Sequence, residues 1–324
     1  MIKLGRRPEF LIWEFGPSRW EGQVMSRRSE DRGFLAFGMR CAAEAAEPGL
    51  HVVSTPIGNL GDITLRALQI LAGVDLILAE DTRFSRRLTD HYGITTPMSP
   101  YHEHNAHEAR PQALARLAEG QSLALISDAG TPLLSDPGYK LVVEAGALGV
   151  HVRPAPGPSA LLAALVAAGL PTDRFLFEGF LPAKTEGRRA RLNALARVPA
   201  TLVFYEAPQR LAACLSDLAT ELGPRSASVA RELTKLHETI DRGSLDDLAI
   251  RYAGVETIKG EIVIVVGPPE DQPAVDEERL SQELAALLGA HTTKDAVAIL
   301  AARHGLPRRN VYARALELSR GRTA

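Results

Sequence analysis

The chain has 324 residues, 45% of them hydrophobic and 23% charged, with a formal net charge of −2 and only two cysteines. This composition is typical of a folded globular protein and argues against a disulfide framework. With a net charge near zero, the protein as a whole does not attract nucleic acid electrostatically. Any binding to nucleic acid would therefore depend on local basic patches. No apolar run reaches the ~18 residues of a membrane span. We therefore expect no membrane partner and a cytoplasmic location.

Residues 1–46 differ in character from the rest of the chain. Both tryptophans, Trp13 and Trp20, occur here, among arginines that alternate with acids and glycines. We expect a poorly ordered extension, with Met25 or Met39 as alternative starts. An arm that contacts a partner is the competing interpretation.

Residues 47–171 are predicted to form an α/β domain. Short apolar runs predict strands at 50–53, 75–79, 122–126 and 151–153. Helical patterns occur at 64–72, 84–93, 106–119, 139–146 and 160–168. Strands that alternate with helices indicate a parallel sheet with right-handed crossovers.

Residues 172–270 are predicted to form a second α/β domain with a mixed sheet. Its strands are expected at 175–177, 201–205, 226–230, 239–242 and 261–266, with helices at 188–197 and 209–222. Residues 276–324 show no strand pattern and predict a small helical tail that resembles a helix-turn-helix unit, with helices at 278–288, 293–303 and 307–318.

The richest motif is SDAGTPLLSDPG, at residues 127–138, directly after a predicted strand. Polar, glycine-containing loops also follow the other strands, at 54–62, 80–83 and 154–159. In a parallel sheet these carboxyl ends converge on one edge, so we expect a single cleft. Neither a dinucleotide fingerprint nor a P-loop occurs. The ligand is therefore expected to be a nucleoside-like cofactor held without a phosphate cradle.

Several charged clusters could serve chemistry or structure. Glu80, Asp81 and Arg83 fit either a helix cap with a surface ion pair or a substrate-positioning group. His102 and His104 would point to opposite sides of an extended segment, so we expect no metal. Basic patches at 183–198 and 303–324 could contact phosphates or be solvated helix faces.

Six motifs in this order resemble the ribosomal RNA small subunit methyltransferase I family, within the tetrapyrrole methylase superfamily. They are STPIGNLGD from residue 54, EDTR from 80, SDAGTPLLSDPG from 127, PGPS from 156, FEGFLP from 177 and FYEAP from 204. The resemblance covers about residues 50–268. It implies S-adenosyl-L-methionine as cofactor, bound in a cleft between two α/β domains. It also implies a homodimer and 2′-O-methylation of a cytidine ribose in small-subunit (16S) ribosomal RNA.

The resemblance assigns cofactor binding to residues of three loops: Pro56, Gly58, Asp128, Ala129, Gly130, Thr131, Pro132, Ser135, Asp136, Pro156, Gly157 and Ser159. A ribose hydroxyl is a weak acid, so a positioned base would help. The catalytic candidates are Glu206, Lys235, Glu80, Asp81 and Arg83, with Glu206 and Lys235 favoured as base and Glu238 as a further candidate. Arg83 and Arg231 could hold RNA phosphates or the flipped nucleotide. Two other functions remain open: a tetrapyrrole C-methyltransferase, and a non-catalytic RNA-binding protein on a methylase fold.

Overall fold

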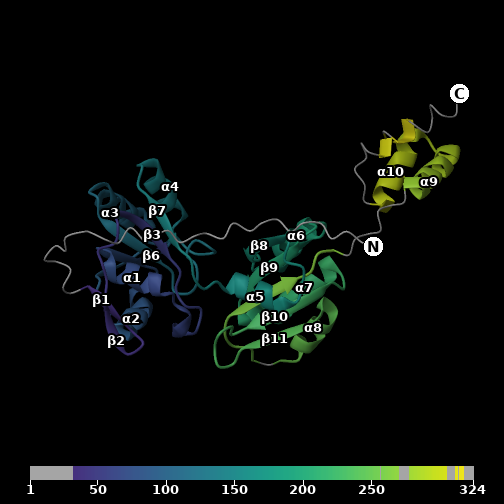
Figure 1. The fold of residues 1–324 in the computed structure, drawn as a ribbon. Coiled ribbons are helices and arrows are strands. Elements are labelled where there is room, and N and C mark those ends of the chain that lie inside the picture. The colour runs from purple at the N-terminus through teal and green to yellow at the C-terminus, as the bar shows by residue number, and fades with distance from the viewer. Residues whose placement is uncertain (1–31, 256, 270–276, 305–310, 313, 317–324) are drawn as a thin grey trace, which may run out of the picture. The chain divides into compact units, whose positions relative to one another are not determined.

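The computed structural model describes residues 32–255, 257–269, 277–304, 311–312 and 314–316, and the chain divides into two compact units between Ser159 and Ala160 (Figure 1). The first unit is built on five parallel strands in the order β5-β4-β6-β3-β7. These are β3 (Gly49–Val53), β4 (Leu76–Ala79), β5 (Met98–Pro100), β6 (Ser122–Ile126) and β7 (Val152–Ala155). The predicted parallel sheet is confirmed, and the short β5 is added to it.

Helices cover both faces of this sheet, which is why β3, β4 and β6 are buried along their whole length. On one face lie α1 (Leu65–Gly73) and α2 (Thr82–His91), in one apolar cluster with Ile77 of β4. On the other lie α3 (Ala106–Ala118) and α4 (Tyr139–Ala147), clustered with Leu78 of the same strand. Neighbouring strand residues point to opposite faces, so β4 serves both cores.

Residues 32–46 are ordered, which corrects the predicted disordered extension through residue 46. The strands β1 (Gly33–Ala36) and β2 (Met39–Ala42) form an antiparallel hairpin, and Phe34 is buried in the α1–α2 core. The backbone N–H of Leu35 donates to Tyr92 O at 2.7 Å. Four-residue strands carry little sequence signal, and the helices that cover them lie far along the chain. Residues 1–31, the rest of that extension, lie outside the described residues.

The second unit contains a mixed five-stranded sheet in the order β11-β10-β12-β9-β8. Its strands are β8 (Phe175–Phe180), β9 (Thr201–Glu206), β10 (Ser226–Arg231), β11 (Thr239–Ser244) and β12 (Ile262–Val266). The pair β8–β9 is parallel and the other neighbours are antiparallel, so the predicted mixed sheet is confirmed. Its apolar core takes side chains from α6 (Thr185–Leu195), α7 (Leu211–Leu222) and the unpredicted α8 (Leu245–Ala253).

Helix α5 (Ala160–Ala168) packs on the second sheet, against β9, β10, β11 and β12. Arg242 Nε donates to Ala168 O at 3.1 Å and ties the helix end to β11. The boundary between the units therefore precedes α5, whereas the sequence placed it after residue 171. A helix of apolar residues has no polar face to indicate which sheet it covers.

The tail helices α9 (Glu277–Ala290) and α10 (Thr293–His304) have a small apolar core of their own, which includes Leu284, Leu300 and Val311. The Asp295 backbone N–H donates to Thr292 Oγ1 at 3.2 Å, which caps α10. Of the third predicted helix, residues 311–312 and 314–316 are described and helical. Within the described residues, no helix combines the length and apolarity needed to cross a bilayer.

Candidate functional site

Three loops of the first unit are joined at the carboxyl ends of β3, β6 and β7. Thr55 and Gly130 exchange two backbone hydrogen bonds, of 2.8 and 3.0 Å. Thr131 Oγ1 donates to Pro158 O at 3.0 Å and lies 3.0 Å from Ser54 Oγ. Its only proton goes to Pro158, so the Ser54 hydroxyl donates to Thr131. The predicted convergence of these loops is thus found within this unit.

Close backbone approach explains the glycines of these loops. A Cβ on Gly157 would lie 2.9 Å from Ser54 Cβ, and one on Gly130 would lie 3.2 Å from Ile57 Cγ2. Gly130 also has φ +79°, which disfavours any side chain. Leu133 and Ser135 occupy the same left-handed region, with φ 76° and 68°. Non-glycine residues held there concentrate at functional sites.

The predicted cofactor residues lie on these joined loops. After β3 come Pro56 and Gly58; after β6 come Asp128, Ala129, Gly130, Thr131, Pro132, Ser135 and Asp136; after β7 come Pro156, Gly157 and Ser159. Ser159 is 8% exposed, and its Oγ has no hydrogen-bond partner among the described residues. An unpartnered buried hydroxyl costs about 1–3 kcal/mol, so this group is suited to a ligand.

Three carboxyl groups influence one another at the ends of β4 and β6. Burial, followed by the negative charge of Glu80, raises the pKa of Asp136 to about 6. Burial and the charge of Asp128 raise the pKa of Glu80, and burial raises that of Asp128. Such a cluster favours a cationic ligand, because a positive charge would relieve the repulsion.

Asp81 and Arg83 form the helix cap and surface ion pair that the sequence offered as one of two interpretations, the other being a substrate-positioning group. Asp81 caps α2 by accepting the Arg83 backbone N–H at 2.8 Å, and Arg83 Nη2 lies 3.0 Å from Asp81 Oδ2. Hydrogen bonds from Arg83 lower the pKa of Asp81 to about 2. A carboxylate so acidic is a poor base near neutral pH. The Asp81 backbone N–H also donates to Asp128 Oδ1 at 3.1 Å, linking α2 to the loop after β6.

Glu206, in the second unit, is enclosed by its own neighbours. Its side chain is 0% exposed, and it accepts hydrogen bonds from Ala207 N at 2.8 Å and Arg210 Nη2 at 3.2 Å. Arg210 is held in turn by Leu181 O at 2.7 Å. Burial and then Glu206 raise the pKa of the Cys214 thiol behind it. These contacts give Glu206 a structural role at the end of β9, which the FYEAP motif could not distinguish from a catalytic one.

Lys235, the other favoured base, is ion-paired with Glu232 at 2.7 Å and Glu261 at 3.2 Å. Burial alone would lower the pKa of Lys235, but hydrogen bonds and charges from these two glutamates outweigh it and raise the pKa. The amine therefore stays protonated and is unsuited to accept a proton. Glu232 and Thr234 have φ 54° and 65°, and Thr234 N donates to Glu238 Oε2 at 2.7 Å. The loop is thus a strained, compact turn that carries the protonated amine of Lys235.

The basic patch at 183–198 is largely neutralised inside the second unit. Arg188 and Asp217 form an ion pair at 2.6 Å with both side chains 4% exposed, and Arg189 binds the other oxygen of Asp217. Arg191 is paired with Glu178. The number of basic residues in this segment therefore overstates the positive charge that is available to bind phosphates. Most of the patch at 303–324 lies outside the described residues; Arg303 is paired with Glu283 at 3.5 Å.

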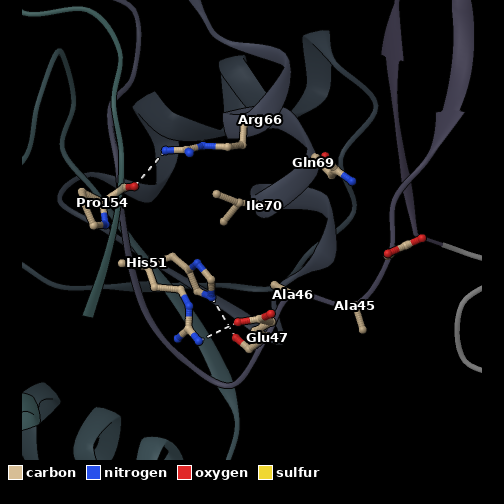
Figure 2. Close-up of a pocket in the computed structure, with 10 residues that line it drawn as sticks. Ala45, Ala46, Glu47, His51, Arg66, Gln69, Ile70 and Pro154 are labelled. Carbon is tan, nitrogen blue, oxygen red and sulfur yellow. Dashed lines mark hydrogen bonds and ion pairs between the residues drawn. The ribbon is translucent and has the colours of Figure 1, made fainter. Parts of the chain in front are cut away.

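A separate pocket of ≈ 200 Å³ lies between α1 and the segment before β3 (Figure 2). Its lining includes Ile70, Arg66 and His51, and none of the predicted site residues. His51 Nε2 lies 2.8 Å from Glu47 O, and burial lowers the pKa of the ring. Arg66 Nη2 donates to Pro154 O at 2.9 Å. The Arg66 contact ties α1 to β7.

Among the described residues, no group of three or more histidine, cysteine, aspartate or glutamate side chains is arranged to hold a metal ion. His102 and His104 instead meet edge to face, with ring centroids 6.1 Å apart.

Comparisons with known proteins agree with this architecture. A family model described as Tetrapyrrole (Corrin/Porphyrin) Methylases matches residues 49–249, and one described as RsmI C-terminal HTH domain matches 274–319. The chain is 54% identical over 280 residues to the Ribosomal RNA small subunit methyltransferase I of Mesorhizobium japonicum, covering 85% of this chain and 94% of that protein. The same-named protein of Synechocystis sp. is 50% identical over 273 residues, covering 83% and 98%. A crystal structure of diphthine synthase shares the fold, with TM-score 0.54, 16% identity and coverage of 67% of this chain and 89% of that one.

Proposed function

The chain belongs to the ribosomal RNA small subunit methyltransferase I family, and from that premise we propose that it methylates a cytidine ribose 2′-hydroxyl of small-subunit (16S) ribosomal RNA. The methyl donor is S-adenosyl-L-methionine. The joined loops of the first unit bind it. The observation that carries this assignment is the pair of backbone hydrogen bonds between Thr55 and Gly130, beside the carboxyl cluster of Glu80, Asp128 and Asp136.

The residues present fit this cofactor. S-adenosylmethionine carries positive charge on its sulfonium and amino groups, which the carboxyl cluster would balance. The unpartnered Ser159 hydroxyl supplies a hydrogen-bonding group, and Gly130 and Gly157 allow the backbone to come close. When bound, the cofactor supplies an electrophilic methyl carbon that needs no further activation. The protein's main contribution is then alignment of donor and acceptor.

Proton removal from the ribose hydroxyl is assigned to Glu80. Of the predicted bases, Glu80 adjoins the cofactor loops, and burial with the charge of Asp128 raises its pKa, which makes it a stronger base than an unperturbed carboxylate. Asp81 is too acidic, Lys235 is held protonated, and Glu206 is enclosed. This choice revises the preference for Glu206 and Lys235 that the sequence alone suggested.

The remaining charged candidates serve the acceptor RNA. Arg83 is 90% exposed even though it binds Asp81, so part of its guanidinium can reach a phosphate. Lys235 adds a second protonated group in the other unit. We further propose that the tail of residues 276–324 assists RNA binding. Deletion of the tail would then weaken RNA binding and reduce its salt dependence, while cofactor affinity would stay unchanged.

The deciding experiment is to map the methylated nucleotide in small ribosomal subunits treated with the protein and labelled S-adenosylmethionine. We expect one labelled cytidine with the methyl on its 2′-oxygen. Transfer to a tetrapyrrole instead, or RNA affinity without turnover, would refute the proposal in favour of the two other functions. A cytoplasmic location follows from the ribosomal substrate. The proposed homodimer is tested by the mass of the protein in solution.

A further inference from the structure

Helix α2 and the neighbouring β1–β2 hairpin of the first unit expose both arginines and phenylalanines, and of these residues only Arg83 has a role in the proposed function. We define the α2–hairpin face as Arg83, Phe84, Arg86 and Arg87 of α2 together with Phe37 at the tip of the β1–β2 hairpin. Helix α2 buries Ser85, Leu88 and Thr89 against the sheet, which leaves all four of its named residues exposed. The hairpin meets the end of this helix, where Leu35 N donates to Tyr92 O at 2.7 Å (Figure 1).

The charge of this face is not neutralised by the fold. Helix α2 holds three arginines and a single acid, Asp90. Arg83 is engaged by Asp81, whereas Arg86 and Arg87 have no acidic partner within the described part of the chain. This contrasts with Arg188, Arg189 and Arg191 of α6, each of which is paired with an acid. The positive charges of Arg86 and Arg87 are thus available to phosphates.

The aromatic rings on this face are displayed rather than buried. Phe37 is 85% exposed and has φ 52°, in a two-residue turn with Gly38 at φ 75°. A bulky residue in this conformation is disfavoured, and here it gains no burial in return. Phe84 is 47% exposed, with the Arg87 guanidinium 5.7 Å from its ring centre. Exposed rings beside arginines are typical of surfaces that stack unpaired bases.

The face adjoins the candidate site, because both ends of α2 contact its loops. The N-terminus of α2 carries the Asp81 N–H that donates to Asp128 Oδ1, in the loop after β6. At its other end, the Tyr92 hydroxyl donates to Leu60 O at 2.7 Å, in the loop after β3. Helix α2 is therefore anchored at both ends to loops assigned to the cofactor. A strand that places one nucleotide at these loops could continue along α2.

We propose that the α2–hairpin face binds an unpaired stretch of ribosomal RNA flanking the methylated nucleotide. Arg86 and Arg87 contact phosphates, and Phe37 and Phe84 stack on bases. This inference rests on the proposed function, since it concerns the same RNA. Unpaired RNA fits this face because its phosphates can pair with the arginines and its bases can stack on the phenylalanine rings.

The test measures binding and methyl transfer for R86Q, R87Q and the double variant R86Q/R87Q. The probes are naked small-subunit ribosomal RNA and intact small subunits. Each lost phosphate contact should reduce the slope of log affinity against log salt by about 0.7–0.9. For R86Q/R87Q we expect RNA affinity to fall roughly tenfold or more, KM for subunits to rise likewise, and kcat and cofactor affinity to stay within about twofold.

Matched controls come from α4, on the opposite face of the sheet. Lys140 is exposed there, and Tyr139 is 72% exposed. K140Q should leave affinity and salt slope unchanged. F37A should weaken binding about fivefold or more, whereas Y139A should not. F37A also keeps the proposal testable if R86Q/R87Q fails to fold, because the hairpin tip is not in the core.

Unchanged RNA affinity and salt slope in both R86Q/R87Q and F37A would overturn the proposal. So would loss of binding to intact subunits with unchanged binding to naked RNA, since the face would then contact a ribosomal protein. These outcomes are separate from failure of the proposed function. If the unmodified protein transfers no methyl group to subunits, the function fails, while binding to naked RNA still reports on the face.

Discussion

Thr55 and Gly130 hold each other by two backbone hydrogen bonds, the N–H of each donating to the carbonyl of the other at 2.8 and 3.0 Å. This small bridge joins the loop after β3 to the loop after β6. Thr55 Oγ1 adds a third link by donating to Ser127 O at 3.1 Å. The cofactor loops are therefore shaped before any ligand binds, which reduces the ordering cost of binding.

Gly130→Ala should damage this bridge. The substitution places a Cβ 3.2 Å from Ile57 Cγ2 at φ +79°. The backbone conformation alone costs roughly 1–2 kcal/mol of unfolding free energy, and the contact displaces Ile57 as well. We expect at least a tenfold loss of S-adenosylmethionine affinity in calorimetry, beside a lowered melting temperature.

Gly120→Ala is the matched control for that substitution. Gly120 has φ +81° and no atom within 4 Å of the added Cβ, so it carries the same backbone cost without the contact. Its cofactor affinity should equal that of the unmodified protein. Equal loss of affinity in both variants would mean that the bridge does not shape the cofactor site.

Asp136→Asn should stabilise the fold and weaken cofactor binding. The pKa of Asp136 is raised to about 6 from 3.8, so its contribution to stability is complete below pH ~4 and is lost as pH rises through about 6. At pH 7.5 the ionised group destabilises the protein, and removing its charge should add about 1 kcal/mol after allowance for solvent screening. Chemical denaturation at pH 7.5 measures this gain.

The same substitution, Asp136→Asn, should lower cofactor affinity although it raises stability. A cation binds the ionised carboxyl more tightly, so Asp136→Asn should reduce S-adenosylmethionine affinity about tenfold if it removes one close charge pair, worth ~1.4 kcal/mol. In the unmodified protein, affinity should also fall as pH drops below about 6. The exposed Asp173 is the control: Asp173→Asn should change neither quantity. Tighter binding by Asp136→Asn would contradict a role for the carboxyl cluster.

Much of the fold was predictable because its signals are local. Apolar runs such as 122–126 and the cap at Thr64, which accepts the Ala67 N–H at 3.1 Å, depend on adjacent residues. Helix α8 was missed although it carries such a signal, a capping box formed by Ser244 and Asp247. The hairpin at 33–42 was missed for a different reason, since its stability comes from α1 and α2.

The candidate site also has a part that the sequence predicts and a part that it does not. The order of loops along the chain predicted which residues converge, because the carboxyl ends of parallel strands must meet. Which charges are free was not predictable, since it depends on tertiary partners. Arg188 and Arg86 look alike in the sequence, yet Arg188 is 3% exposed beside Asp217, and Arg86 is exposed without an acid among the described residues.

Arg188→Met tests the structural role of the α6 arginines. The pair Arg188–Asp217 is buried on both sides, and removing one partner of such a pair costs about 3–5 kcal/mol. Arg189 also contacts Asp217, so a loss near the lower bound is expected. The exposed Arg191 gives the comparison: Arg191→Met should cost no more than about 1 kcal/mol. Urea denaturation measures both. A small effect of Arg188→Met would show that Arg189 alone compensates the buried carboxylate.

Glu80→Gln and Lys235→Gln separate the two candidates for the base. Removal of a general base lowers kcat by about 10²–10⁴, and we expect this of Glu80→Gln, with cofactor affinity changed less than tenfold.

The pH dependence of kcat gives a second readout. In the unmodified enzyme kcat should rise as pH passes the raised pKa of Glu80, and this rising limb of the pH profile should be absent in Glu80→Gln. Lys235→Gln should instead raise KM for subunits several-fold and keep the pH limb, because the ion-paired amine does not lose its proton in this range. Single-turnover rates as a function of pH, at saturating cofactor and over a range of subunit concentrations, measure both effects. Loss of the limb in Lys235→Gln alone would assign the base to Lys235.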